Sequence, residues 1–309
     1  MKALPPANTV KIAVNTIHDR KGDDYMSYMR FNFRSQCLGH YVDVSIVYPT
    51  DSYSYYQQSP AASPLSMEGQ RSRIYTPGMK FQTVYLIHGG GDDDTLTYRY
   101  SNAERYAQEN HVMLVTPNIC NSFGIDTRYG TKYQTFLSEE LPVVIQSLFA
   151  SSPKREDNFI IGYAMGGNVA LGTAIMHPSL FHTCVDISGG IGMTLSTQTL
   201  KEELNGDHFK NHFPLYNAAF GDAEQLDDSP YDLYSIARKN IQSGEPVCDF
   251  HIVCGSDEFI RTRVEKDVEI LKKLGYPVNY ICPEGYRHDF ILWDEYIKIA
   301  LNKLLPLKR

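Results

Sequence analysis

The segment IIGYAMGGN, residues 160–168, joins an apolar run to a glycine-rich turn that leads into a helical pattern. Its spacing is that of G-x-S-x-G, in which a nucleophilic serine occupies a sharp strand-to-helix turn, but Ala164 stands in the serine's place. Residues two before and two after the centre crowd such a turn, and Gly162 and Gly166 are small enough. The N–H of Met165 would point from a helix N-terminus toward developing negative charge. Taken alone, residues 162–167 fit a turn without a catalytic role equally well.

A second glycine loop, HGGG, directly follows the apolar run Thr83–Ile87. Such a loop can complete an oxyanion hole, so we expect the Gly90 N–H to join that of Met165, with His88 and Gly89 lining the substrate pocket. A phosphate cradle is the competing interpretation, but neither GK[ST] nor GxGxxG accompanies the loop, and the aspartates at 92–94 would repel phosphate. One histidine beside a flexible acidic turn is also a weak metal site, and we predict no metal.

An acid and a histidine follow later apolar runs in the order nucleophile, acid, histidine. Asp257 comes just after the run 250–254, and His288 lies after the last predicted strand and before the last predicted helix. Taken separately, Asp257 could be a helix N-cap and His288 any surface histidine. Together with position 164 they predict a triad at the carboxyl ends of the strands, where open α/β sheets bind ligands.

The elements that must position these residues alternate between strands and helices after residue 81. This alternation predicts an α/β fold with a mainly parallel central sheet and helices on both faces. The alternating segment Tyr41–Tyr48 and its neighbour Met29–Phe33 predict antiparallel N-terminal strands, and residues 51–79 a surface loop. We expect one domain over residues 1–309, with 190–245 as a helical cap insertion. The predicted buried strands are Thr83–Ile87, Val112–Val115, Phe159–Ile161, Thr183–Ile187, Phe250–Cys254 and Val278–Cys282.

Composition excludes several other classes of protein. The chain has 309 residues and a net charge of −7 without a basic run, which argues against nucleic-acid binding. No stretch approaches the ~20 apolar residues of a membrane span, and the first residues lack the apolar core of a signal peptide. The six cysteines are scattered, which favours reduced thiols in a cytoplasmic protein over a secreted disulfide framework. We expect a small-molecule substrate, no cofactor and no membrane partner, and a homo-oligomer stays open.

Four segments carry a family resemblance: LIHGGG…NAERYAQENHVMLVTPN, RYGTKYQTFLSEELPVVIQSLF, KREDNFIIGYAMGGNVAL and GYRHDFILWDEYI. Together they resemble the esterase D and tributyrin-esterase branch of the α/β-hydrolases, which includes feruloyl and acetyl carbohydrate esterases and S-formylglutathione hydrolases. The resemblance implies an α/β-hydrolase fold and a serine carboxylesterase without metal or cofactor. It implies a nucleophile at position 164, His288 as general base oriented by Asp257, and an oxyanion hole from Gly90 and Met165.

The chain departs from the family pattern at several positions. Gly124 stands where members often have an aromatic residue, and Phe290 where the usual residue is tryptophan, so the acyl pocket could differ. Ala164 is the larger departure, because a methyl group cannot attack a carbonyl. We favour an engineered Ser→Ala replacement over a natural pseudoenzyme, because Asp257, His288 and the glycines would otherwise be expected to drift.

The sequence therefore predicts a carboxylic-ester hydrolase for short-chain or feruloyl-type esters, present in a form that lacks its nucleophile and is inactive. An S-formylglutathione hydrolase is the alternative enzyme, and a non-catalytic ligand-binding protein is the alternative from another class. Trp293, the single tryptophan, follows His288 closely. We expect it first to pack and hold the histidine loop, and second to form a wall of the substrate pocket.

Overall fold

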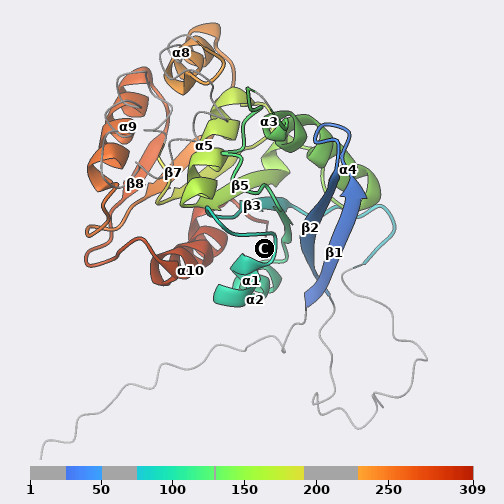
Figure 1. Ribbon diagram of the computed structural model, residues 1–309. Coiled ribbons are helices and arrows are strands. Elements are labelled where there is room, and N and C mark those ends of the chain that lie inside the picture. The colour runs from blue at the N-terminus through green and yellow to red at the C-terminus, as the bar shows by residue number, and fades with distance from the viewer. Residues whose placement is uncertain (1–25, 51–74, 129, 191–228, 309) are drawn as a thin grey trace, which may run out of the picture.

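The computed structural model describes residues 26–50, 75–128, 130–190 and 229–308 (Figure 1). Within them one sheet has the strand order β1-β2-β4-β3-β5-β6-β7-β8. The two N-terminal strands are antiparallel to their neighbours, and all other pairings are parallel. The strands are β1 Met26–Arg34, β2 Tyr41–Pro49, β3 Thr83–Ile87, β4 Met113–Pro117, β5 Asn158–Tyr163, β6 Thr183–Ile187, β7 Asp249–Val253 and β8 Val278–Ile281. The predicted mainly parallel sheet with antiparallel N-terminal strands is confirmed.

Helices cover both faces of this sheet. The cluster on one face includes buried side chains from α4, α5, α8 and α9, and that on the other face includes side chains from α2 and α10 (Figure 1). π-Helical turns at Phe136–Glu140 and Ala300–Leu304 continue α3 and α10. The helices are α1 Leu96–Tyr100, α2 Ala103–Glu109, α3 Tyr133–Thr135, α4 Leu141–Leu148, α5 Met165–Met176, α8 Leu233–Ser243, α9 Arg261–Leu274 and α10 Phe290–Ile299.

The central strands of the sheet lie inside the protein over their whole length. Every residue of β3, β5 and β6 is buried, as expected for parallel strands covered on both faces. The helix α5 follows β5 directly and is buried on nearly every side, which suits its apolar sequence MGGNVALGTAIM. A rigid strand–turn–helix unit at the centre of the sheet therefore carries position 164.

Two predicted features lie largely outside the described residues. The surface loop predicted at 51–79 is described only from residue 75. Of the cap insertion predicted at 190–245, the described part contains α8. Among the described helices, none is long and apolar enough to cross a membrane.

Candidate active site

Ala164 occupies a strained turn between β5 and α5. Its backbone angles are φ 51° and ψ −124°, a conformation that residues other than glycine rarely adopt. A Cβ added at Gly162 would lie 1.9 Å from the carbonyl oxygen of Gly166, and one added at Gly166 would lie 2.2 Å from that of Ile87. Only glycine fits at these two positions, so the turn that the sequence predicts is present, with Ala164 at its tip.

The amides predicted to form an oxyanion hole lie beside this turn. Met165 is the first residue of α5, where backbone N–H groups lack partners within the helix. A Cβ added at Gly90 would lie 3.8 Å from Cβ of Met165, so the loop after β3 and the start of α5 are adjacent. The next amide of the loop, that of Gly91, donates to Asn121 Oδ1 at 2.7 Å. The structure thus brings Gly90 and Met165 together next to Ala164.

His88 fixes this loop from inside the protein. The Nδ1 atom lies 2.8 Å from the Gly89 carbonyl oxygen, and Nε2 accepts from the Ile119 N–H at 2.9 Å, so the proton is on Nδ1. Burial lowers the pKa of His88, which keeps the ring neutral. The side chain has no exposed surface and Gly89 is buried. The structure therefore places both residues inside the protein, where His88 supports the loop, and their predicted part in the substrate pocket stays a prediction.

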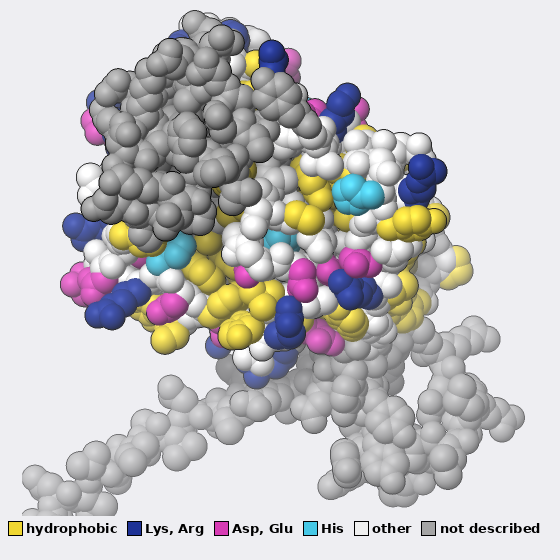
Figure 2. Space-filling view, viewed as in Figure 1, with side chains coloured by type: hydrophobic (Ala, Val, Ile, Leu, Met, Phe, Trp, Pro, Cys, Tyr) yellow, Lys and Arg dark blue, Asp and Glu magenta, His cyan; other side chains and the backbone are white. Residues whose placement is uncertain are grey.

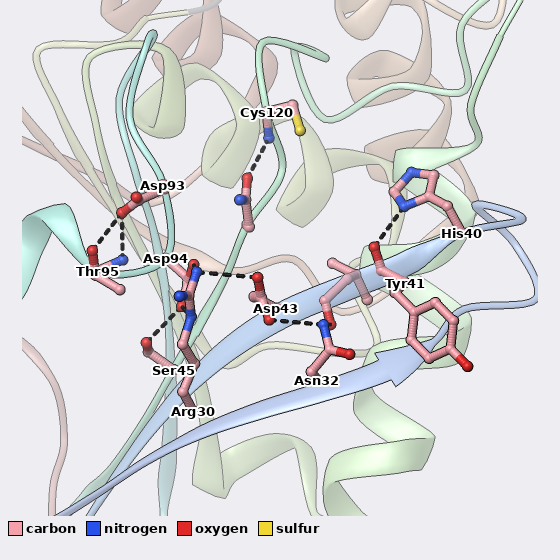
Figure 3. A network of polar contacts seen from close by, with 12 residues as sticks. Arg30, Asn32, His40, Tyr41, Asp43, Ser45, Asp93, Asp94, Thr95 and Cys120 are labelled. Carbon is pink, nitrogen blue, oxygen red and sulfur yellow. Dashed lines mark hydrogen bonds and ion pairs between the residues drawn. The ribbon is translucent and has the colours of Figure 1, made fainter.

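An ion pair between a half-exposed arginine and a buried aspartate anchors the same loop to the N-terminal strands (Figure 3). The guanidinium of Arg30 on β1 donates to both carboxylate oxygens of Asp94, at 3.0 and 2.8 Å, and Ser45 on β2 donates to one of them at 2.8 Å. Asp94 is fully buried. Asp94 thus serves the fold. No group of three or more metal-ligating side chains occurs among the residues that the structure describes.

His288 is held by a carboxylate that comes from the loop after β7. Its Nδ1 lies 2.7 Å from Oε2 of Glu258, and its side chain is 25% exposed, so the ring reaches the surface. The other carboxylate oxygen of Glu258 accepts from the Gly255 amide and from the Ser188 hydroxyl, both at 2.7 Å. Burial alone would raise the pKa of Glu258, but the bonds from His288, Gly255 and Ser188 outweigh it and hold the pKa below its ordinary value. An ionised carboxylate therefore orients the histidine.

Trp293 connects this pair to the turn at position 164. Its indole stacks on Tyr163, the neighbour of Ala164, with ring centroids 4.9 Å apart, and meets the His288 ring edge-on at 5.2 Å. It also donates from Nε1 to the Ser188 hydroxyl at 3.1 Å. Trp293 is buried, so the structure gives it the packing position that the sequence favoured over a pocket wall. The candidate site unites the ends of β3, β5, β6 and β7 with the start of α10.

A family model described as "Putative esterase" matches residues 70–272. The chain belongs to this esterase family. The esterase is 24% identical over 278 residues to the acetyl esterase of Caldicellulosiruptor saccharolyticus, with 90% of this chain and 97% of that one covered. The matched range includes Ala164 and Glu258 and ends before His288.

Solved structures share the fold. The substrate-bound serine hydrolase FphF of Staphylococcus aureus has a TM-score of 0.72 at 23% identity, covering 91% of this esterase and 99% of that chain. The S-formylglutathione hydrolase FrmB of the same organism has a TM-score of 0.70 with equal identity and coverage. An S954A mutant of a feruloyl esterase module from Clostridium thermocellum, complexed with sinapinate, has a TM-score of 0.57 at 15% identity, with 90% and 87% covered.

The acidic partner of His288 differs from the sequence prediction for this esterase. Asp257 is exposed, and its carboxylate accepts from the Ser256 hydroxyl at 2.9 Å, whereas the next residue, Glu258, turns into the protein. Asp257 is not the helix N-cap either, because Ile260 occupies that position of α9. The sequence GSDE contains two adjacent carboxylates, and the structure brings Glu258, and not the predicted Asp257, to His288. Ser188, with φ 61°, was missed because no local pattern marks it.

Exposed aromatic rings flank the histidine of this esterase. Phe259 is 59% exposed and lies 5.1 Å from the His288 ring. Tyr100 is 63% exposed and stacks on Phe290 at 5.0 Å, and Phe290 in turn contacts Trp293. Figure 2 shows hydrophobic side chains gathered over α10 and the neighbouring α1. The surface beside His288 therefore suits a ligand with an apolar or aromatic part.

Proposed function

We propose that this site is organised to hydrolyse carboxylic esters through an acyl-enzyme, with position 164 in the place of the nucleophile. The backbone of Ala164 carries the proposal. A φ of 51° at a residue with a Cβ costs roughly 1–3 kcal/mol, and such a strained turn has a use where it exposes a nucleophilic side chain. The elbow glycines, the adjoining amides of Gly90 and Met165, and the His288–Glu258 pair support it.

With serine at position 164, each group has a defined task. The serine Oγ attacks the ester carbonyl carbon while His288 Nε2 takes its proton, and the Nδ1 proton stays bonded to Glu258. The amides of Gly90 and Met165 donate to the oxyanion of the tetrahedral intermediate. The intermediate collapses as His288 protonates the leaving alcohol. Water then attacks the acyl-serine with His288 as base, which releases the acid and restores the serine.

The chain with Ala164 lacks the atom that attacks, so it forms no acyl-enzyme. Serine would fit the same turn, because it adds one oxygen to a Cβ that the backbone already accommodates. Loss of the nucleophile leaves only the catalysis that binding and the oxyanion hole provide. We therefore expect the chain to bind esters and turn them over at a rate near background.

The substrate class rests on the relatives and on the surface beside His288. An acetyl esterase and a feruloyl esterase among the similar proteins favour short-chain or feruloyl-type esters. The exposed ring of Phe259 and the stacked pair of Tyr100 and Phe290 favour an aromatic acyl or alcohol part. The S-formylglutathione hydrolase neighbour keeps a thioester substrate as the alternative.

The test is Ala164→Ser, assayed with short-chain nitrophenyl esters, methyl ferulate and S-formylglutathione. We expect hydrolysis to appear in the variant and to stay near background in the parent chain. The matched control is Ala164→Ser combined with His288→Ala, which keeps the serine but removes its base. No gain on any ester or thioester would refute the hydrolase and favour the second candidate.

That second candidate is a ligand-binding protein without catalysis, and Ala164 itself is the observation that favours it. Such a protein would use the elbow, the amides and the aromatic surface to hold an ester or acid. Calorimetric titration of the parent chain with methyl ferulate, alongside the activity assay of Ala164→Ser, separates the two. Binding without any activity in the serine variant would select the binder.

A further inference from the structure

A cavity lies along α5, the helix that begins at the elbow. It has a volume of about 120 Å³ and is bounded by α5, the start of α8, α3 and the loop after β4. Its walls are mostly carbon, and they include Phe123, Ile125, Val169, Met176 and Leu233.

The cavity extends along α5 from the first turn of the helix to its last. Asn168 and Val169, four and five residues after Ala164, line one end, and Met176, twelve residues after it, lines the other. At 1.5 Å of rise per residue, Asn168 and Met176 lie about 6 and 18 Å from position 164 along the axis. A small molecule beside Met176 would therefore lie at the end that is remote from the elbow.

One polar group in the cavity wall lacks a partner. Gln134 is 8% exposed, and its Nε2 makes no hydrogen bond, while its Oε1 accepts from the Thr173 hydroxyl at 3.4 Å. An unpaired buried donor is unfavourable, so Gln134 Nε2 gains from an acceptor in the cavity.

Other polar groups of the wall are used within the protein. The Tyr231 hydroxyl donates to the Asp126 carbonyl oxygen at 2.8 Å, and Asn168 Nδ2 donates to the Gly190 carbonyl oxygen at 2.7 Å. The Asp126 carboxylate accepts from the amide and the hydroxyl of Thr135. Among the described side chains of this largely apolar wall, Gln134 Nε2 is thus a buried donor that the protein itself leaves unpaired.

Gly172 leaves space in this wall. A glycine inside a helix is less favourable than an alanine. A Cβ at Gly172 would meet only the ends of flexible side chains, the nearest being Leu233 Cδ1 at 3.3 Å. Gly162 and Gly166, by contrast, touch backbone at 1.9 and 2.2 Å. The packing around Gly172 therefore does not demand glycine, and the missing side chain adds to the cavity volume.

We propose that this cavity binds a small neutral organic molecule that has an apolar body and one acceptor oxygen for Gln134 Nε2. The volume is near that of cavities of about 150 Å³ that bind benzene, which limits the body to roughly six non-hydrogen atoms. A carboxylate is disfavoured because Asp126 lines the cavity. Water is a poorer occupant, since it needs two to four polar partners and most of the wall is carbon.

The probe is cyclopentanone, a neutral ketone of six non-hydrogen atoms, compared with cyclopentane, which lacks the acceptor, and butanoate, which is charged. Binding is followed by NMR of methyl-labelled methionines, because Met176 lines the cavity and Met165 lies beside position 164. We expect cyclopentanone to shift the Met176 methyl saturably and leave Met165 unchanged, with butanoate without effect. No Met176 shift at tens of millimolar ketone would overturn the proposal.

Variants of the cavity wall test whether Gln134 Nε2 is the hydrogen-bond donor to the ligand. Gln134→Leu should weaken cyclopentanone binding at least tenfold and leave cyclopentane binding unchanged. The matched control is Gln82→Leu, because Gln82 is also 8% exposed with an unpaired Nε2 but lies outside the cavity wall. If Gln134→Leu does not fold, Gly172→Ala serves instead and should weaken both cyclic probes several-fold. Equal ketone affinity in the parent chain and a folded Gln134→Leu variant, or in the parent chain and Gly172→Ala, would overturn the proposal.

Discussion

The indole Nε1 of Trp293 donates to the hydroxyl oxygen of Ser188 at 3.1 Å, and this contact directs the hydroxyl proton toward Glu258. Ser188 can use its single proton only once, and the incoming indole N–H occupies one of its lone pairs. The hydrogen bonds from Trp293 to Ser188 and from Ser188 to Glu258 therefore both point toward the Glu258 carboxylate, which accepts from His288 Nδ1 on its other oxygen.

Trp293→Phe in the Ala164→Ser background keeps an aromatic ring and removes this N–H. We expect kcat to fall about three- to tenfold with little change in KM, because Glu258 is held less firmly. Loss of stability with unchanged kcat would show that Trp293 acts by packing alone.

Glu258→Gln and Asp257→Asn, both in the Ala164→Ser background, identify the acid that orients His288. Glu258→Gln should lower kcat/KM by about 10³–10⁴-fold, since the amide cannot hold the imidazole in the required tautomer and stabilise its charged form. Asp257→Asn should stay within about threefold, because Asp257 is exposed. Steady-state kinetics with a nitrophenyl ester measures both, and the opposite ranking would return the role to Asp257.

Ala164→Gly tests the strain at the elbow. Relief of the positive φ should raise the free energy of unfolding by about 1–3 kcal/mol. The greater conformational freedom of glycine in the unfolded chain should lower it by about 0.5–1 kcal/mol. We expect a net gain of about 1 kcal/mol in the free energy of unfolding, measured by urea denaturation. Ala170→Gly, a buried position inside α5 with ordinary helical geometry, is the matched control and should destabilise by about 1 kcal/mol. A loss in both variants would contradict strain at position 164.

Arg30→Met tests the anchor of the loop that carries Gly90 (Figure 3). It leaves the fully buried Asp94 without its cation, and we expect a loss of about 1–3 kcal/mol, reduced from the value for a buried pair because Arg30 is 47% exposed. The control is Arg99→Met, which removes the partner of the exposed Asp93 and should cost less than about 1 kcal/mol. Equal losses in the two variants would argue against a special role for the Arg30–Asp94 pair.

Much of the fold could be predicted from the sequence because its determinants are local. Short apolar runs such as Thr83–Ile87 and Thr183–Ile187 coincide with strands, since each is bounded by turn residues and buried throughout. The turn at Ala164 was predictable for a similar reason: Gly162 and Gly166 are required by close backbone contacts within one strand–turn–helix unit.

The parts of the site that the sequence did not predict depend on contacts between distant segments. Whether Asp257 or Glu258 reaches His288 depends on how the loop after β7 turns back, and adjacent carboxylates look alike in the sequence. Ser188 becomes relevant only because β6 and β7 bring it to Glu258. The burial of His88 likewise follows from its bond to the Ile119 amide, which no local motif encodes.

Asp186 should make stability depend on pH. Burial is the main cause that raises its pKa to about 7, the carboxylates of Asp267 and Glu258 add to the rise, and the amides of Gly190 and Gly189 oppose it. Because its pKa is higher in the folded than in the unfolded state, the folded protein binds this proton more tightly. Its contribution therefore becomes unfavourable as pH rises from about 4 to about 7 and is constant above that range, with a total of at most about 4 kcal/mol.

Asp186→Asn stays neutral at every pH, so the variant should gain stability relative to the parent chain as pH rises from 4.5 to 7.5. The variant loses one amide contact, since an amide nitrogen cannot accept from Gly189 or Gly190, and this shifts the difference by a constant amount. Urea denaturation at a series of pH values measures that difference, and the histidines common to both proteins cancel from it. A difference that does not change between pH 4.5 and 7.5 would show that Asp186 is ionised in the folded protein throughout this range, held by its two amide bonds despite complete burial.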